Sequence, residues 1–384
     1  MKRICAQMLM IVVATATWAA STPAQQAGSS GPSPSGNASK SLYPPVDANL
    51  QASFRISAAG ATQVVLELNG RHEMTRDANG LWRITTDPLT PGFHYYSFIV
   101  DGVPVADPAC ESYFAMGRMV SGIEVPAKGE DFYVAKNVPH GDIHGPVYVT
   151  KSPHESRRVL IYTPPDYDQG QSRRYPVLYL QHGYGEDQQA WLRQGKANFI
   201  LDNLLAAGKA KPMIVVMANG GIATRLDYGR GRGPAGAPAT DADRVAFALA
   251  FEPVMIKELI PMIDANFRTI ADREHRAMAG TSMGALQTLQ ITVKHLDTFA
   301  YIGGFSPALS ADISRIADAP GTFNEKVKVL FLGTAEIDGN PNIKNLHEIL
   351  EKAGVKHVYY ESPGMADEWL TWRRELYQFA PLLF

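Results

Sequence analysis

The sequence Gly280-Thr281-Ser282-Met283-Gly284 constrains the fold more than any other part of the chain. It fits the pattern G-x-S-x-G, and it lies between an apolar run at 275–279 and a helix-forming run that begins at 285. Small residues let the chain turn sharply from a strand into a helix. We therefore predict a turn that exposes Ser282 Oγ at a sheet edge and aims the Met283 N–H at a developing oxyanion.

Apolar strands alternate with helices on both sides of this turn, which predicts a parallel sheet with helices on both faces. Strands are expected at 147–151, 158–162, 177–181, 213–217, 275–279, 300–305, 327–332 and 357–360. Helices are expected at 199–207, 252–266 (with a bend at Pro261), 285–295, 343–353 and 369–379. The fold class is therefore α/β over residues 136–384.

The preceding block, residues 41–135, has the pattern of short strands separated by turns. Strands are expected at 52–56, 63–68, 81–85 and 93–100, and Asp101-Gly102 is a strong signal for a two-residue hairpin. This spacing predicts a small all-β sandwich in front of the α/β domain.

The first 24 residues have the features of a secretory signal peptide. Lys2 and Arg3 precede a short apolar run at 11–20 that ends in small residues. Residues 25–40 are rich in Ser, Gly and Pro and are expected to be a flexible linker. We therefore expect a bacterial periplasmic or secreted protein with no stable membrane insertion after cleavage. Cys110 would then be the one cysteine left, so no internal disulfide is expected.

The composition excludes some partners. A net charge of -2 with 19% charged residues leaves no basic stripe, so no nucleic-acid partner is expected. Residues 228–240, rich in Gly, Pro and Ala, follow the strand at 213–217. Two interpretations stay open for them, a flap over the site and a surface insertion. The sequence does not indicate an oligomeric state.

The loop after the strand at 177–181 is the expected source of a second oxyanion donor. Its glycines let the backbone approach a ligand, so the N–H of Tyr184 or of Gly183 is the candidate. His182 is expected to be structural, with its ring bonded within the loop. Trp191 is interpreted either as a wall of the substrate pocket or as a core residue. An acid that orients a catalytic base is expected after the strand at 327–332, at Glu336, with Asp338 as the alternative.

With these pieces placed, the chain resembles carbohydrate esterase family one, the feruloyl and acetyl xylan esterases of the α/β-hydrolase group. The resemblance rests on the segments 175–183, 275–284, 299–306 and 368–373. The segments 91–96 and 100–103 resemble immunoglobulin-like, glycogen-binding-type modules, which can bind carbohydrate or only pack against the catalytic domain.

The resemblance implies ester hydrolysis on a carbohydrate or polysaccharide through an acyl-serine, with no metal and no organic cofactor. Ser282 would be the nucleophile and Glu336 the acid. Met283 and Tyr184 would be the oxyanion donors, and Gly183 and Trp191 would line the substrate pocket.

The chain departs from the family at one position. The family's catalytic histidine directly precedes the segment that matches Glu368-Trp369, and this chain has Asp367 there. A carboxylate is a poor base for a serine hydroxyl and cannot act as an imidazolium toward the leaving group. Asp367 is also expected to face Glu336. The later histidines, His295, His347 and His357, are not placed to substitute.

Three functional interpretations stay open: an impaired esterase, a catalytically inactive relative that binds carbohydrate or an ester, and an enterochelin-esterase-like siderophore hydrolase. The third would need a basic pocket, for which Arg225, Arg230 and Arg232 are candidates.

Overall fold

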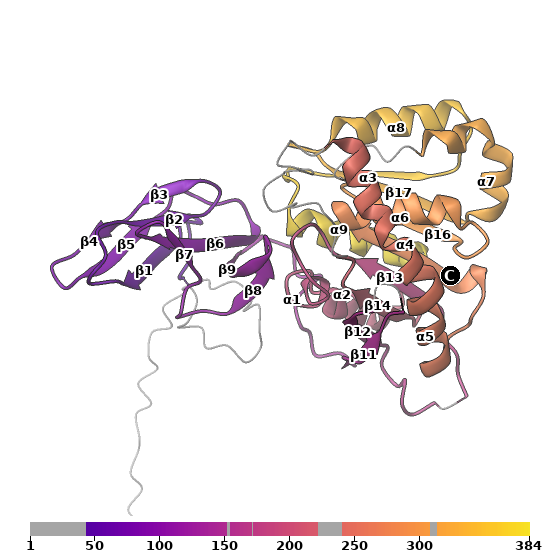
Figure 1. Cartoon of the computed structure of the whole chain (residues 1–384), viewed down its shortest axis with the longest axis horizontal. Coiled ribbons are helices and arrows are strands. Elements are labelled where there is room, and N and C mark those ends of the chain that lie inside the picture. The colour runs from indigo at the N-terminus through magenta and orange to yellow at the C-terminus, as the bar shows by residue number, and fades with distance from the viewer. Residues whose placement is uncertain (1–43, 152–153, 171, 222–239, 308–312) are drawn as a thin grey trace, which may run out of the picture.

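The computed structural model describes residues 44–151, 154–170, 172–221, 240–307 and 313–384 (Figure 1). The proposed signal peptide and linker lie outside the described residues, and so do residues 228–239 of the proposed flap and the candidate arginines Arg225, Arg230 and Arg232. The chain forms two antiparallel sheets at its N-terminal end and one large mixed sheet with helices, which lie side by side in Figure 1.

The two small sheets pack face to face as a sandwich, as the turn spacing predicted. Apolar side chains from both of them, such as Phe54, Trp82, Leu66 and Phe98, share one buried cluster. The first sheet has the order β1(Ser53–Ser57), β5(Leu81–Thr85), β4(Thr75–Arg76). The second has the order β3(Arg71–Glu73), β2(Val64–Glu67), β6(Gly92–Val100), β9(Arg118–Val125), β8(Ser112–Ala115), with β7(Val103–Val105) paired to β6.

The hairpin between β6 and β7 turns at Asp101 and Gly102, whose φ angles are 47° and 86°. Both values lie in the left-handed region that this kind of two-residue turn requires. The Asp101 carboxylate also accepts hydrogen bonds from the backbone N–H groups of Thr62 and Gln63, which ties the turn to the start of β2.

The large sheet confirms the predicted α/β class. Its core is parallel and the first strands are antiparallel to it, because β12 pairs antiparallel with β14 while every later neighbour pairs in parallel. The strand order is β10(Asp142–His144), β12(Ser156–Thr163), β14(Ile214–Ala218), β13(Val177–Gln181), β15(Arg276–Thr281), β16(Tyr301–Phe305), β17(Val329–Ala335), β18(Val358–Ser362), with β11(Val147–Val149) beside β12.

Alternation along the strands divides the core into two layers. In β13, Leu178 and Leu180 face the cluster that contains Trp369 of α9, whereas Val177 and Tyr179 face the opposite cluster with Leu259. The first layer is covered by α1(Ala190–Arg193), α2(Ala197–Ala206) and α9(Trp369–Phe379), while the other face carries α3(Asp241–Ala250), α4(Glu252–Val254), α5(Ile260–Asn266), α6(Met283–Lys294), α7(Pro320–Lys326) and α8(Pro341–Lys352). Short 3-10 turns lie at Arg273–His275, Ser314–Asp318 and Ala380–Leu382.

The helices differ from the sequence prediction in several places, since α1, α3 and α7 were not predicted. The expected helix at 252–266 bends through a π-helical segment, Met255–Leu259, directly before Pro261. Proline has no N–H for the regular bond to the preceding turn, and the wider turn accommodates it. The sequence did not predict α3, which begins after a capping box formed by Thr240 and Asp243.

The sandwich and the α/β domain share a core. Phe93, Tyr113 and Tyr133 pack into the same buried cluster as Trp369. Beside them, Arg373 on α9 makes a two-pronged ion pair with Glu124 on β9, with N–O distances of 2.7 and 2.9 Å and both side chains buried. The Arg373 guanidinium also donates to the Gln194 carbonyl at 2.8 Å from Nε and lies 4.3 Å from the Tyr133 ring centroid. The junction therefore has no free charge at this point.

Replacing Arg373 with methionine should lower the free energy of unfolding by about 3–5 kcal/mol, because the Glu124 carboxylate would stay buried without its partner. Urea denaturation followed by circular dichroism measures this loss. The control is Arg83→Met, which removes a cation of the exposed Arg83–Asp77 pair and should cost less than about 1 kcal/mol. Equal losses in the two variants would contradict a role for the buried pair.

Candidate active site

Ser282 occupies a strained turn between β15 and α6. Its φ and ψ are 51° and -114°, and its N–H donates to the Phe305 carbonyl at 3.0 Å. Two glycines make the turn possible: a Cβ at Gly280 would lie 2.6 Å from the Gly284 carbonyl carbon, and a Cβ at Gly284 would lie 2.5 Å from the His182 oxygen. This is the geometry of a nucleophile elbow, in which only small residues fit on either side of the serine.

No histidine reaches the Ser282 hydroxyl, although all ten histidines of the chain lie in the described ranges. His182 comes nearest in the fold. It is buried, its Nδ1–H donates to the Gly183 carbonyl at 2.7 Å, and its Nε2 accepts from the Gly220 N–H at 3.1 Å. Both ring nitrogens are therefore engaged in a brace between two loops, and burial lowers the pKa of His182. The structure thus gives His182 the structural role that the sequence indicated.

The three later histidines have partners elsewhere. His295 ends α6 and pairs with Glu252 at 2.9 Å, about 20 Å along the helix axis from the serine. His347 and His357 are bonded to each other at 2.8 Å. His357 precedes β18, a strand parallel to β17, so it lies at the sheet edge opposite the elbow.

The loop after β13 lies against the elbow as predicted. A Cβ at Gly183 would be 3.7 Å from the Ser282 Cβ. The Gly183 N–H, however, donates to the Glu186 carboxylate at 3.0 Å, so this candidate oxyanion donor is already engaged. The Met283 N–H belongs to the first turn of α6, where the helix itself supplies no acceptor.

Trp191 is a core residue, which was the second of the two interpretations, and not a wall of the cavity. It is 1% exposed, its indole N–H donates to the Gln181 carbonyl at 2.8 Å, and its ring packs edge to face with Trp369 and Phe305. It does not line the cavity described below.

Asp367 is held by a loop between β18 and α9. Its N–H donates to Asp338 Oδ1 at 2.6 Å, and its Oδ1 accepts from the Trp372 indole N–H at 2.7 Å. Glu336 binds the Gly364 N–H instead and makes no contact with Asp367 among the described residues. The expected Glu336–Asp367 pair is therefore not formed, because the two acids bind different N–H groups of the same loop. Desolvation, opposed by bonds from Trp372 and Ser306 and reinforced by Asp338, raises the pKa of Asp367.

Glu375, which the sequence analysis missed, lies behind Asp367. It is fully buried, its Oε1 is 3.0 Å from Ser306 Oγ, and its Oε2 has no hydrogen-bond partner among the described residues. Burial and the nearby Asp367 raise the pKa of Glu375 well above its usual range, so the fold favours the protonated form of this carboxyl. Its segment, TWRREL, has the composition of an exposed helix face, and no local pattern marks the glutamate as buried.

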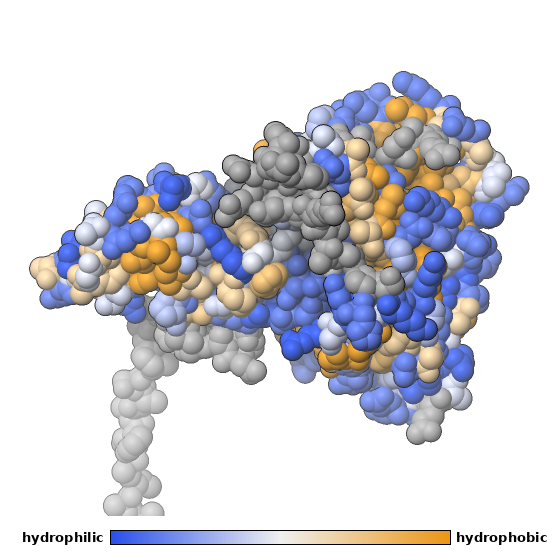
Figure 2. Space-filling model, viewed as in Figure 1, coloured by the Kyte–Doolittle hydropathy of each residue, from blue (hydrophilic) through white to orange (hydrophobic). Residues whose placement is uncertain are grey.

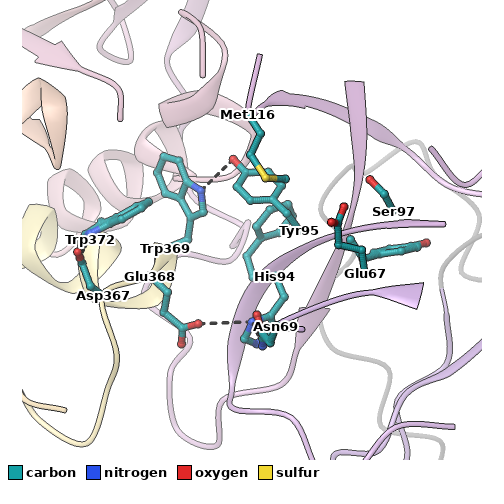
Figure 3. A pocket seen from close by; sticks show the side chains of 12 residues that line it. Glu67, Asn69, His94, Tyr95, Ser97, Met116, Asp367, Glu368, Trp369 and Trp372 are labelled. Atoms are coloured by element: carbon teal, nitrogen blue, oxygen red, sulfur yellow. Dashed lines mark hydrogen bonds and ion pairs between the residues drawn. The ribbon is translucent and has the colours of Figure 1, made fainter. Parts of the chain in front are cut away.

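A cavity of about 300 Å³ opens beside Asp367, between the sandwich and the α/β domain (Figure 3). Its walls combine acids, an amide and aromatic rings: Glu67, Asn69, Phe93, His94, Tyr95, Tyr96, Ser97 and Met116 from the sandwich, and Asp367, Glu368, Trp369 and Trp372 from the other side. Burial, followed by the charge of Asp338, raises the pKa of Glu368 to about 7. His94 Nδ1 lies 3.5 Å from the Glu368 carboxylate across the domain junction.

In the view of Figure 2, hydrophobic residues form patches on both the sandwich and the α/β domain, among hydrophilic ones. Within the described residues there is no cluster of three or more metal-ligating side chains and no helix with the length and hydropathy of a membrane span.

Comparison with known proteins agrees with this geometry. A family model described as a putative esterase matches residues 150–332, which include the elbow. A curated relative from Xylanibacter ruminicola, named an endo-1,4-β-xylanase/feruloyl esterase, is 40% identical over 351 residues. The chain is thus similar in sequence to esterases. The alignment covers 89% of this chain and 46% of the relative, so the chain spans about half the length of that larger protein.

Solved structures show that the chain has the α/β-hydrolase fold. An enterochelin esterase from Shigella flexneri superposes with a TM-score of 0.61 at 18% identity, over 86% of this chain and 91% of the other. A ferulic acid esterase from the fungus Anaeromyces mucronatus gives 0.55 at 22% identity, over 66% and 95%.

The buried Glu375 should make stability depend on pH. The pKa of Glu375 is higher in the folded than in the unfolded protein. Its contribution to the free energy of unfolding is therefore fully present at pH values below the ordinary glutamate pKa, and it is lost as the pH rises through the pKa in the folded protein. The unfolding free energy of Glu375→Gln minus that of the wild type should therefore increase from pH 4 to pH 9 in urea titrations. Glu348→Gln, at an exposed position of α8, is the control and should give a constant difference.

Proposed function

We propose that the chain hydrolyses carboxylic esters of carbohydrates, of the feruloyl or acetyl xylan type, through an acyl-serine on Ser282, and that Asp367 makes it a slow enzyme. The observation that carries the proposal is the backbone of Ser282, held at φ 51° beside the Gly183 loop. Such strain at a serine is maintained where the hydroxyl must be presented to a substrate.

In this mechanism Ser282 Oγ attacks the ester carbonyl carbon, and the sugar alcohol leaves when the tetrahedral intermediate collapses. The N–H groups of Met283 and Tyr184 stabilise the oxyanion, since the Gly183 N–H already donates to Glu186. Gly183 itself forms the floor beside the serine. Water then hydrolyses the acyl-serine. Glu336 keeps the place of the family's acid, and it holds the loop that carries Asp367 through the Gly364 N–H.

Asp367 stands where an imidazole would accept the serine proton. Its raised pKa makes it a better base than an ordinary aspartate, but it already accepts hydrogen bonds from Trp372 and Ser306, and a carboxyl does not act as an imidazolium toward the leaving group. Loss of a triad base lowers turnover by factors on the order of 10⁴ to 10⁶, and oxyanion stabilisation accounts for the residual rate.

The cavity beside Asp367 supports a carbohydrate as the alcohol part of the ester. Carboxylates and an amide accept and share hydrogen bonds with sugar hydroxyls, and indole rings such as that of Trp372 pack on the C–H faces of a sugar. The sandwich supplies Asn69 and Glu67 to this wall, so it contributes to binding as a carbohydrate-binding module would. Export by the N-terminal signal would bring the enzyme to such substrates outside the cytoplasm.

A catalytically inactive, ligand-binding relative is the second candidate, and one observation favours it: every histidine near the cleft is engaged away from Ser282. No specific contact favours a siderophore hydrolase, since the arginines that would bind an anionic ligand lie outside the described residues.

The test of catalysis is Asp367→His. We expect the wild type to hydrolyse 4-nitrophenyl acetate slowly and the variant to be at least about 100-fold faster in kcat, because an imidazole restores a base near neutral pH. Ser282→Ala in both backgrounds is the control and should abolish the activity. Equal rates with aspartate and histidine at 367 would contradict the assignment of this position, and activity that survives Ser282→Ala would contradict the acyl-serine.

The test of binding is sedimentation with insoluble arabinoxylan. The wild type should be depleted from solution, and Trp372→Ala should reduce the depleted fraction at least about threefold because it removes an aromatic wall of the cavity. Trp82→Phe, a conservative change inside the sandwich core, is the control. Binding without hydrolysis of any ester would favour the inactive relative.

A further inference from the structure

A buried carboxylate joins the sandwich to the loop beside Ser282. Glu186 is 8% exposed. Its Oε2 accepts from the Gly183 N–H at 3.0 Å, and its Oε1 accepts from the Tyr95 hydroxyl at 2.7 Å. Tyr95 belongs to β6 of the sandwich, so one side chain links the two domains through two hydrogen bonds. Neither Glu186 nor Tyr95 takes part in the mechanism described above.

The Tyr95 hydroxyl has no alternative orientation. Its oxygen accepts from the Gln194 side-chain amide at 2.8 Å and from the Trp369 indole N–H at 3.1 Å, the second of which is drawn in Figure 3. A phenol has one proton to donate and two lone pairs to offer. Both lone pairs are used, so the proton is committed to Glu186.

A second contact holds the same loop from the same side. The Gly117 N–H, in the turn between β8 and β9, donates to the Gly185 carbonyl at 3.0 Å. Gly185 has a φ of 74°, and a Cβ there would lie 2.9 Å from the Met116 Cα. The sandwich therefore packs directly on residues 183–185, whose other side lies against Ser282.

We propose that Tyr95 and Glu186 are positioning residues that fix the 183–185 backbone against Ser282, which makes the sandwich an integral part of the active site. Without the phenol proton, Glu186 loses its bond from Tyr95 in a buried position, and the Gly183 and Tyr184 amides lose their fixed orientation. The kinetic consequence rests on the proposed esterase function; the ordering of the loop does not.

The hydrogen bond from Tyr95 affects the ionisation of Glu186. Burial, together with the adjacent Asp187, raises the pKa of Glu186 to about 7, while the bonds from Tyr95, Gly183 and Trp369 oppose the rise. Tyr95 from β6 and Asp187 from its own loop are the titratable groups that face it among the described residues. A protonated Glu186 is a weaker acceptor for the Gly183 N–H. The loop is therefore held more firmly above neutral pH than below it.

Tyr95→Phe in the full chain tests the proposal by hydrogen exchange and by kinetics. The Gly183 and Tyr184 amides should exchange about tenfold faster than in the wild type, the factor that a hydrogen bond of ordinary strength represents. On 4-nitrophenyl acetate, kcat should fall about tenfold while KM stays within about twofold, since the change affects oxyanion stabilisation and not substrate contact.

The matched control is Tyr162→Phe. Tyr162 on β12 is buried and donates at 2.7 Å to Asp202, a carboxylate that also accepts a glycine N–H, from Gly141. It lines neither the cavity nor the Ser282 loop. This variant should show a comparable loss of thermal stability and unchanged exchange at 183–184. The proposal is overturned if the amides of 183–184 are protected from hydrogen exchange equally in Tyr95→Phe and Tyr162→Phe.

Glu186→Gln covers the case in which Tyr95→Phe does not fold. The amide keeps an oxygen for the Gly183 N–H but cannot titrate. After correction for intrinsic exchange rates, protection of the loop should rise between pH 6 and pH 8 in the wild type and stay flat in the variant. A pH dependence that is the same in both proteins contradicts the proposal. A wild type with an ordered loop but no hydrolysis of any ester contradicts the proposed function alone.

Discussion

The ion pair between Arg373 and Glu124 fixes the element on which the remaining architecture depends. It pins α9 against the sandwich in a setting where neither charge reaches water. The same helix carries Trp369, which contacts Tyr95, and Glu375, which lies behind Asp367. The domain junction and one cavity wall therefore lie on one helix, and the candidate catalytic position lies in the loop directly before it. A change at the junction is transmitted to the site by the rigid helix and needs no separate pathway.

The carboxyl groups around Asp367 shape the electrostatics of the whole cleft. Asp367, Glu368 and Glu375 all have raised pKa values, because each is desolvated and each feels another carboxylate. The like charges favour shared protons over full ionisation. Such a cluster stabilises itself by remaining partly neutral, and a neutral carboxyl is the wrong form for accepting a serine proton.

Local patterns predicted the elements but not the long-range contacts. The strand 177–181 and the helix 369–379 have the bounds that their apolar periodicity indicated, and the elbow follows from glycines that are adjacent in sequence. β10 and α3 were missed because one is three residues long and the other follows a segment without a clear pattern. Glu336 was expected to contact residue 367, with Asp338 as the alternative acid. In the structure it is Asp338 that accepts the Asp367 N–H. Glu186 and Tyr95 are 91 residues apart, a separation at which sequence spacing carries no information.

The acidic lining of the cavity has a consequence for the last step of the proposed ester hydrolysis. That reaction would turn an uncharged acyl group into an anion. A cleft walled by the carboxyl groups of Glu67, Asp367 and Glu368 would tolerate the former and repel the latter. Departure of the free acid would thereby be favoured, and accumulated product would compete poorly with fresh substrate.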